Sequence, residues 1–252
     1  MDLINTISRF PQCGVGNKLL YYWNLRQKSN ANGYDWDMVS DADINSIIDI
    51  QYPSLNFDMR KHMELPFCLG ENFFNYTKNR VPIGDIFKLK FEKTGNTICT
   101  NFEYCYIHLR GGDFRFWKNG EGMLSLDYYW NSLNHIIKIA KKPLHIQFIT
   151  DDKNHPHLLP LSQLMDTNDI NYGMHPLREN DITNDWSEDW YTLAHADYII
   201  SSPSTFAITA GMISNAYITH SKEWVDKRVS ENDSFWVGLN NGGNNEYKAV
   251  MI

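Results

Sequence analysis

The second half of the sequence alternates between short apolar runs and longer segments with helical periodicity. The apolar runs have the length of buried strands and cover residues 104–109, 144–149, 198–200 and 216–219. Helical spacing covers residues 126–140, 186–196 and 205–213, and Ser125 is a typical helix N-cap before the first of them. Strands that alternate with helices through short connections predict an α/β fold with a parallel, Rossmann-like sheet.

The first half of the sequence is less regular. Residues 34–98 mix short apolar pieces with prolines and polar loops. Ahead of them, residues 13–17 predict a glycine turn, and Lys18 to Arg26 has helical spacing. A chain of 252 residues can form two small domains. We therefore expect an N-terminal α/β half over residues 1–98 and a Rossmann-like half over residues 99–252, with a flexible Asn/Gly-rich stretch at 240–245.

Charge and composition exclude several classes of protein. With 23 Lys and Arg against 30 Asp and Glu, the net charge is −7, and no basic stripe that could bind nucleic acid is visible. An acidic chain can still bind a nucleotide, because local groups hold phosphates. The four cysteines form no Cys-x-x-Cys pair that would indicate a zinc site. Without a signal-peptide pattern or an apolar run of about 18 residues, we expect a cytoplasmic protein with no transmembrane segment.

Polar side chains lie at or just beyond the ends of three of the predicted strands. They are His108, Arg110 and Asp113 at the first strand, Asp151 and Asp152 at the second, and Ser204 and Thr205 at the third. Ligands of open parallel sheets bind at the carboxyl ends of the strands. An arginine can bind a diphosphate through two parallel hydrogen bonds, and a helix that starts at Ser204 offers unpaired backbone N–H groups to the same anion. Carboxylates suit the donor groups of a ribose or a guanine, so the sequence predicts a nucleotide-diphosphate site.

Four segments of the sequence also match the motifs of one enzyme family, in the same order. They are Gly14–Leu20 (Gly-x-Gly-Asn-x-Leu), Tyr106–Asp113 (His-x-Arg-x-x-Asp), Leu126–Tyr129, and Asp189–Asp197 followed by Ser201–Phe206. In these segments the chain resembles the fucosyltransferases that use GDP-fucose, the α1,2, α1,6 and protein O-fucosyltransferase group. Two departures stand out: Gly111 replaces a second arginine found in many members, and residues 207–210 replace a short aromatic run of the α1,2 group.

The resemblance implies a B-type glycosyltransferase with two Rossmann-like halves around a cleft. Such an enzyme would move L-fucose from GDP-fucose to a carbohydrate hydroxyl, with inversion. The implied catalytic residues are Arg110, on the diphosphate, and Asp113, as base. The implied donor-binding residues are Gly14, Gly16, Asn17, His108, Asp151, Asp152, Asp189, Ser204, Thr205 and Phe206. Among these, Asp189 would accept hydrogen bonds from guanine or ribose, and the helix start at Ser204 would hold phosphate.

Two other functions stay open at this point. The same fold could use GDP-mannose or a UDP-sugar, or the chain could be a non-catalytic nucleotide- or glycan-binding relative. Arg110 and Asp189 argue against the latter, because a glycan binder needs neither. Asp35-Trp-Asp37 and Asp41-Ala-Asp43 look like the metal-binding Asp-x-Asp of other glycosyltransferases. Both pairs occupy a polar stretch and do not end a predicted buried strand, so we expect no metal cofactor.

Overall fold

The structure is a computed structural model that describes residues 101–175, 186–214, 216–231 and 248–252 and shorter pieces elsewhere. Those pieces are residues 6–8, 14–20, 23, 36–38, 44, 48–49, 88–89 and 236. The chain divides into two compact units: Met1–Thr94 with Arg228–Glu246, and Gly95–Lys227 with Tyr247–Ile252. The division between residues 98 and 99 expected from the sequence stays a prediction.

A six-stranded parallel sheet forms the centre of the second unit, in the order β10-β9-β8-β5-β6-β7. Its strands are β5 (Glu103–Leu109), β6 (Leu144–Thr150), β7 (Tyr172–Met174), β8 (Tyr198–Ser201), β9 (Tyr217–His220) and β10 (Lys248–Met251). The chain starts in the middle at β5, runs outward to β7, returns to β8 beside β5, and continues outward to β10. This is the Rossmann strand order, and it places the topological switch point between β5 and β8.

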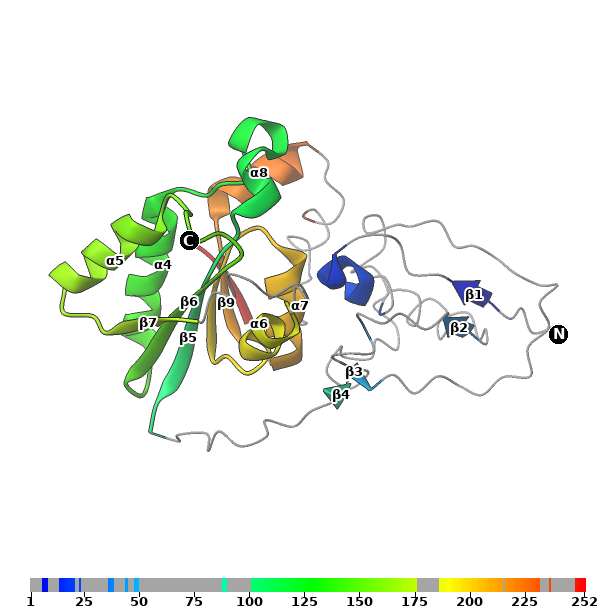
Figure 1. Ribbon diagram of the computed structural model, residues 1–252, viewed down its shortest axis with the longest axis horizontal. Coiled ribbons are helices and arrows are strands. Elements are labelled where there is room, and N and C mark those ends of the chain that lie inside the picture. Colours follow the sequence, from blue (N-terminus) through cyan, green and yellow to red (C-terminus); the bar gives the residue numbers. More distant parts are fainter. Residues whose placement is uncertain are drawn as a thin grey trace. The chain divides into compact units, whose positions relative to one another are not determined.

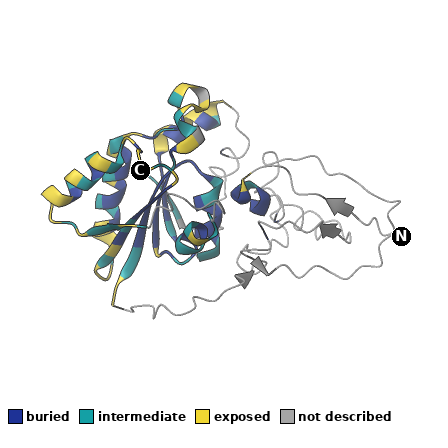
Figure 2. Cartoon of the chain, in the orientation of Figure 1, coloured by how far each residue is buried: buried dark blue, intermediate teal, exposed yellow. Residues whose placement is uncertain are grey.

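The helices cover both faces of this sheet. They are α4 (Leu126–Ile139), α5 (Leu158–Thr167), α6 (Trp186–Leu193), α7 (Thr205–Ser214) and α8 (Lys222–Ser230). Figure 1 shows α4 and α5 on one face and α6 and α7 on the other. Right-handed crossovers require this, because the chain crosses the sheet in opposite directions before and after the switch point. The strands at the centre of the sheet are accordingly buried (Figure 2).

Helix α4 begins where the sequence predicts it. The Ser125 side chain accepts a hydrogen bond from the backbone N–H of Tyr128 at 3.2 Å, which satisfies one free donor of the first turn. The buried hydroxyl of Tyr128 lies 2.9 Å from the carbonyl oxygen of Ser201 and 2.8 Å from that of Thr219. This tyrosine therefore ties α4 to the ends of β8 and β9, and burial raises the pKa of its hydroxyl, which keeps it protonated.

Helix α7 is apolar on nearly all sides and lies deep in the second unit. Gly211 faces the sheet at a point where no side chain fits: a Cβ at this position would lie 2.2 Å from Cδ1 of Ile218 and 3.2 Å from Cδ1 of Ile199. The glycine therefore lets the helix backbone approach the strands closely.

Two pairs of short strands are described in the first unit: β1 (Thr6–Ser8) with β2 (Trp36–Met38), parallel, and β3 (Ile48–Asp49) with β4 (Lys88–Leu89), antiparallel. Residues 15–20 are helical. The predicted glycine turn through Asn17 is thus wrong in its extent, because the helix already starts at residue 15. Asp37 lies within β2. Asp35, Asp41, Asp43 and the stretch 240–245 lie outside the described residues.

The second unit contains elements that sequence reasoning missed. They are α5, α8, β7 and β10, and β10, not residues 216–219, is the last strand. Helix α6 ends at Leu193, three residues before the expected end at residue 196. The predicted strands around the switch point and the starts of α4, α6 and α7 are confirmed.

Buried histidines predict a loss of stability in acid. Burial lowers the pKa of His220 to about 4 and that of His108 to about 3, where Arg110 also contributes. The unfolded histidine has a pKa of about 6.5, so the unfolded state binds protons first as the pH falls below that value. We expect the free energy of unfolding to fall by roughly 2 kcal/mol for each of these groups between about pH 7 and pH 5.

Urea unfolding at the two pH values measures this loss. NMR titration of the histidine rings gives an independent check, because the His108 and His220 signals should not shift over the same range. Equal unfolding free energies, or titration of either ring near pH 6.5, would contradict the prediction.

Candidate functional site

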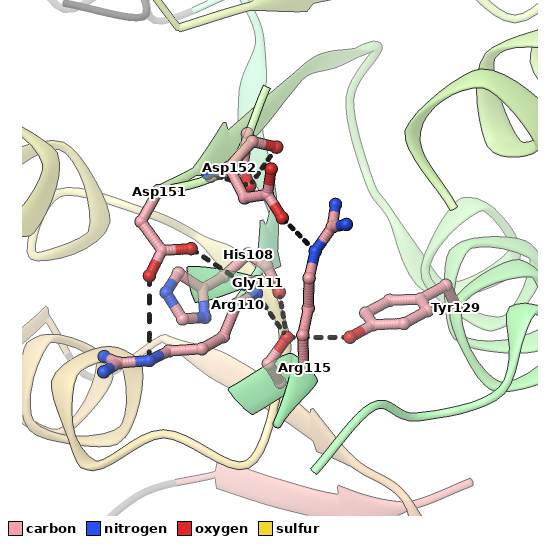
Figure 3. A network of polar contacts seen from close by, with 9 residues as sticks. His108, Arg110, Gly111, Arg115, Tyr129, Asp151 and Asp152 are labelled. Carbon is pink, nitrogen blue, oxygen red and sulfur yellow. Dashed lines mark hydrogen bonds and ion pairs between the residues drawn. The ribbon is translucent and has the colours of Figure 1, made fainter. Parts of the chain in front are cut away.

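The candidate site lies at the carboxyl ends of the strands beside the switch point. In the sheet register, His108 pairs with Ser201 of β8 and Leu109 pairs with Thr150 of β6. The residues that follow these pairs therefore meet at one edge of the sheet (Figure 3). The structure thus brings His108, Arg110, Asp151 and Asp152 together with the start of α7.

Ser202, directly after β8, fixes the end of β5. Its hydroxyl donates to the carbonyl oxygen of His108 at 2.7 Å. Because the Ser202 hydroxyl has donated its hydrogen, its Oγ can only accept, and it does so from the backbone N–H of Arg110 at 2.9 Å and from the hydroxyl of Tyr129 at 2.7 Å. Ser202 and Tyr129 are both 1% exposed, so these bonds are shielded from water. The backbone that carries Arg110 is therefore rigidly held, and Ser202 is a positioning residue that the sequence alone did not reveal.

Asp151 holds Arg110 from the neighbouring strand. One carboxylate oxygen accepts from the backbone N–H of Gly111 at 2.7 Å, and the other lies 3.8 Å from Nε of Arg110. Because this contact is made at Nε, the two Nη groups stand at the far tip of the side chain in Figure 3. The guanidinium also lies over the ring of Phe114, 5.0 Å from its centroid. Asp151 is therefore placed to orient Arg110, whereas a direct contact with a donor stays a prediction.

Asp152 and Arg115 form a second pair next to the first. Asp152 contacts Nε of Arg115, whose guanidinium also donates to the backbone carbonyl of Asn154. Arg115 lies at the end of a 3₁₀ turn, η1 (Gly112–Arg115), which starts at the second of the two glycines. Sequence reasoning missed Arg115, although the Gly111-Gly112 pair was a signal, because a tight turn there returns the following residues to the same rim. The rim thus carries two cations, each beside an aspartate of the β6 loop.

Gly111 is required by this packing. A Cβ at position 111 would lie 2.3 Å from Cβ of Asp152 and 2.4 Å from one of its carboxylate oxygens. We expect Gly111→Ala to displace Asp152 and lower the free energy of unfolding by about 1–3 kcal/mol. Gly173→Ala is the matched control, because its Cβ would meet Gln147 only at ordinary contact distance, 3.6 Å. Urea denaturation of both variants measures the difference, and equal stability would contradict the prediction.

His108 lies inside the rim and is neutral. It is 5% exposed, and burial lowers its pKa to about 3. Its ring stacks on that of Phe206 at 6.0 Å between centroids. Among the described residues its Nδ1 has no hydrogen-bond partner. A buried ring nitrogen without a partner is a feature expected of a site that a ligand completes.

The amino end of α7 faces the same rim. Ser204 is buried, and Thr205 and Phe206 are half-buried. The ring of Phe206 lies between His108 and Trp186, the first residue of α6, whose ring it meets edge-on at 6.4 Å. These contacts join the start of α7 to the end of β5 and the start of α6. The first-turn N–H groups of α7 therefore point to the side on which Arg110 is held.

Asp189 lies on α6 and has a partner that the sequence did not predict. Its carboxylate is 3.0 Å from Nδ1 of His175, the residue after β7, and the other ring nitrogen of His175 is 3.1 Å from the hydroxyl of Thr192. The backbone N–H of His175 donates to the carbonyl of Phe148 at 2.9 Å. The Asp189 side chain is 35% exposed, so the histidine orients it while part of the carboxylate faces solvent.

The structure does not place the remaining predicted residues, Asp113, Gly14, Gly16 and Asn17, at this rim. Asp113 lies within η1, but its side chain is outside the described part. Gly14, Gly16 and Asn17 belong to the first unit, at the start of the helix over residues 15–20, where the N–H of Lys18 donates to the carbonyl of Gly14 at 3.2 Å. Their role in donor binding stays a prediction.

In the part of the chain that the structure describes, no helix is long and apolar enough to cross a membrane. No three or more His, Cys, Asp or Glu side chains of that part gather so that they could hold a metal ion.

No protein-family model matches the sequence, and no curated protein matches it. The structure is similar to crystal structures of fucosyltransferase NodZ from Bradyrhizobium. One of them matches with a TM-score of 0.51 at 14% identity, over 84% of this chain and 94% of that chain. The NodZ α1,6-fucosyltransferase co-crystallized with GDP gives 0.52 at 14% identity over 86% and 96%. The same enzyme soaked with GDP-fucose gives 0.52 at 13% identity over 83% and 92%.

The chain therefore has the fold of a GDP-fucose-dependent fucosyltransferase. NodZ is one protein that shares this fold, and the match covers nearly the whole length of NodZ. The predicted α/β class and the resemblance drawn from the sequence motifs are thereby confirmed at the level of the fold.

Proposed function

We propose that this protein is an inverting glycosyltransferase that moves L-fucose from GDP-fucose to a carbohydrate hydroxyl. The observation that carries the proposal is the convergence of Arg110 and the amino end of α7 at the switch point, through Ser202 and the His108–Phe206 stack. That edge is where Rossmann-type sheets bind nucleotides. The NodZ structures obtained with GDP and GDP-fucose share the fold and support the choice of donor. We further propose a cytoplasmic location, on the sequence grounds given above.

The leaving group is the part of the reaction that these residues can stabilise. Arg110, held by Ser202 and Asp151, would bind the diphosphate through its guanidinium, and the N–H groups at Thr205 and Phe206 would bind the same oxygens. Arg115 adds a second positive charge on the same rim. As the bond to the sugar breaks, negative charge grows on the diphosphate, so donors fixed in advance lower the barrier. His108, neutral at physiological pH, would donate or accept a single hydrogen bond without adding charge.

At the sugar, the transition state should resemble an oxocarbenium ion, as in glycoside cleavage. The acceptor hydroxyl then attacks the face opposite the diphosphate, which inverts the configuration of the anomeric carbon. Its proton leaves late, when the carbon is already cationic, and Asp113 is the proposed base. Asp189, oriented by His175, would accept hydrogen bonds from guanine or ribose.

The test measures binding and turnover together. Calorimetry with GDP and UDP should show binding of GDP and much weaker binding of UDP. Release of GDP or UDP is then followed over GDP-fucose, GDP-mannose and UDP-sugars in the presence of mixed oligosaccharide acceptors. Turnover of GDP-fucose above the others supports the proposal. Preference for another donor would establish the same fold with a different sugar, and nucleotide binding without turnover would indicate a non-catalytic relative.

We also propose that the transfer needs no metal ion, because Arg110 and the amino end of α7 supply the positive charge a metal would bring. Turnover of GDP-fucose should be unchanged when EDTA is present in excess over any contaminating metal. The control is the same assay with added manganese, which should not raise the rate. Complete loss of turnover in EDTA, restored by manganese, would contradict the prediction and direct attention to Asp35 and Asp37.

A further inference from the structure

The segment that follows Arg110 exposes aromatic rings at its surface. It consists of η1 and a second 3₁₀ turn, η2 (Trp117–Gly120). Phe116, between the two turns, is 82% exposed, and Trp117 is 36% exposed. Exposed large apolar side chains are common singly, but two adjacent aromatic rings next to a polar rim indicate a binding surface. We call Phe116 and Trp117 the aromatic platform.

The aromatic platform stands on a segment that is fixed from below. Trp117 stacks on Phe114 at 5.8 Å and meets the buried ring of Trp224, on α8, at 5.7 Å. Phe114 in turn lies beneath the guanidinium of Arg110 and packs so closely on residue 122 that only glycine fits there. The ion pair of Arg115 with Asp152 anchors the same segment from the other side. Phe116 is therefore exposed on a turn whose neighbouring residues are held in place by packing and by an ion pair.

An ion pair borders the aromatic platform. Glu121, just after η2, lies 3.0 Å from Nζ of Lys227 on α8, and both side chains are at least 40% exposed. Lys227 is one turn from Trp224, whose ring packs against Trp117. The surface therefore combines flat apolar rings with a carboxylate and an ammonium group at its edge. This combination matches the two surfaces of a sugar ring, an apolar face of C–H groups and a rim of hydroxyls.

We propose that the aromatic platform binds the carbohydrate acceptor. A pyranose ring would stack on Phe116 and Trp117, and its hydroxyls would bond with Glu121 and Lys227. The stacked side chains of Arg110, Phe114 and Trp117 connect this surface to the rim where the diphosphate is proposed to bind. A bound glycan would therefore have one end beside the donor sugar. That the bound glycan is the acceptor rests on the proposed function. The glycan-binding surface itself does not depend on turnover.

The experiment uses the full-length protein and four immobilised glycans: lactose, N-acetyllactosamine, cellotetraose and chitotetraose. Binding is compared among the wild type, Phe116→Ser, Phe116→Tyr and Leu159→Ser. Leu159 is the matched control, since it is a large apolar residue that is 65% exposed and belongs to α5, not to the segment after Arg110. Calorimetry with GDP is run on each variant as a separate measure of the donor site, and thermal unfolding confirms that each is folded.

We expect the wild type to retain at least one of these glycans, and Phe116→Ser to bind it about tenfold more weakly or worse. Phe116→Tyr should keep the affinity, because the ring is preserved, and Leu159→Ser should match the wild type. GDP affinity should be the same in all four proteins. If neither the wild type nor any variant binds GDP, the proposed function is overturned. The glycan measurements would still decide whether the aromatic platform binds carbohydrate.

Three results would overturn the proposed platform. The wild type could retain none of the four glycans, or Phe116→Ser could bind them as well as the wild type does. Sedimentation could also show a dimer that Phe116→Ser converts to a monomer, which would assign this surface to a second copy of the chain.

Discussion

Arg110→Ala is expected to lower turnover of GDP-fucose on the order of 100- to 1000-fold, the typical loss for one preorganised donor at a site of growing negative charge. The effect should fall mainly on kcat, because the charge on the diphosphate is larger in the transition state than in the bound substrate. Arg110→Lys should restore only part of the rate, since an ammonium group lacks the planar pair of donors. The measurement is donor turnover and GDP affinity on variants with an unchanged melting temperature.

Lys222→Ala is the control for losing one positive charge, because Lys222 pairs with Asp226 on the exposed face of α8. If Arg110 served only to pair with Asp151, its loss would change stability by about 1 kcal/mol or less and leave turnover intact. Near-normal turnover and GDP affinity in Arg110→Ala would thus remove this residue from the site, and with it the main support for the proposed function.

Asp189→Ala is expected to weaken GDP binding by roughly 10- to 150-fold, which corresponds to about 1.5–3 kcal/mol for a hydrogen bond to a charged group. If the partner is the guanine, UDP binding should hardly change and the ratio of GDP to UDP affinity should fall. If the partner is the ribose, both affinities should fall together. Calorimetry with both nucleotides measures it.

Glu188→Ala separates this role from a general effect of charge at the helix start. Glu188 is exposed and lies in the same first turn of α6, so both carboxylates interact with the helix dipole in the same way. GDP affinity should be normal in Glu188→Ala. A parallel loss in both variants would show that the negative charge near the start of α6, and not a contact with guanine, is what matters.

The central strands and the rim were predictable because neighbouring residues in the sequence are enough to identify them. β5 is buried over its last five residues and β6 over its last three, so each has a largely apolar segment of strand length. Arg110 stands between such a run and two glycines, a position that is hard to explain by structure alone. By contrast, β7 and β10 are edge strands of only three and four residues, too short for a periodic pattern to reveal them, and only pairing with β6 and β9 makes them strands.

The partners of the predicted residues could not be found from spacing. His175 meets Asp189 from the far end of a three-residue strand, and Arg115 reaches Asp152 only because η1 turns the chain back. Ser202 looked like one hydroxyl among several, and its three hydrogen bonds come from residues 73 to 94 positions away in the chain. The sequence therefore revealed which residue types gather at the rim, whereas tertiary packing decides which of them orient the others.

The Ser202 bonds also determine when the rim can form during synthesis. Arg110 emerges from the ribosome 92 residues before the hydroxyl that fixes its backbone. Until β8 returns beside β5, the end of β5 has no partner on that side, and closing so long a loop is slow compared with forming α4. A nascent chain that stops before residue 202 therefore contains Arg110 but lacks the hydrogen bond that fixes its backbone. The last third of the chain adds neither of the two rim arginines nor their aspartate partners, yet it completes the edge of the sheet proposed to bind the diphosphate.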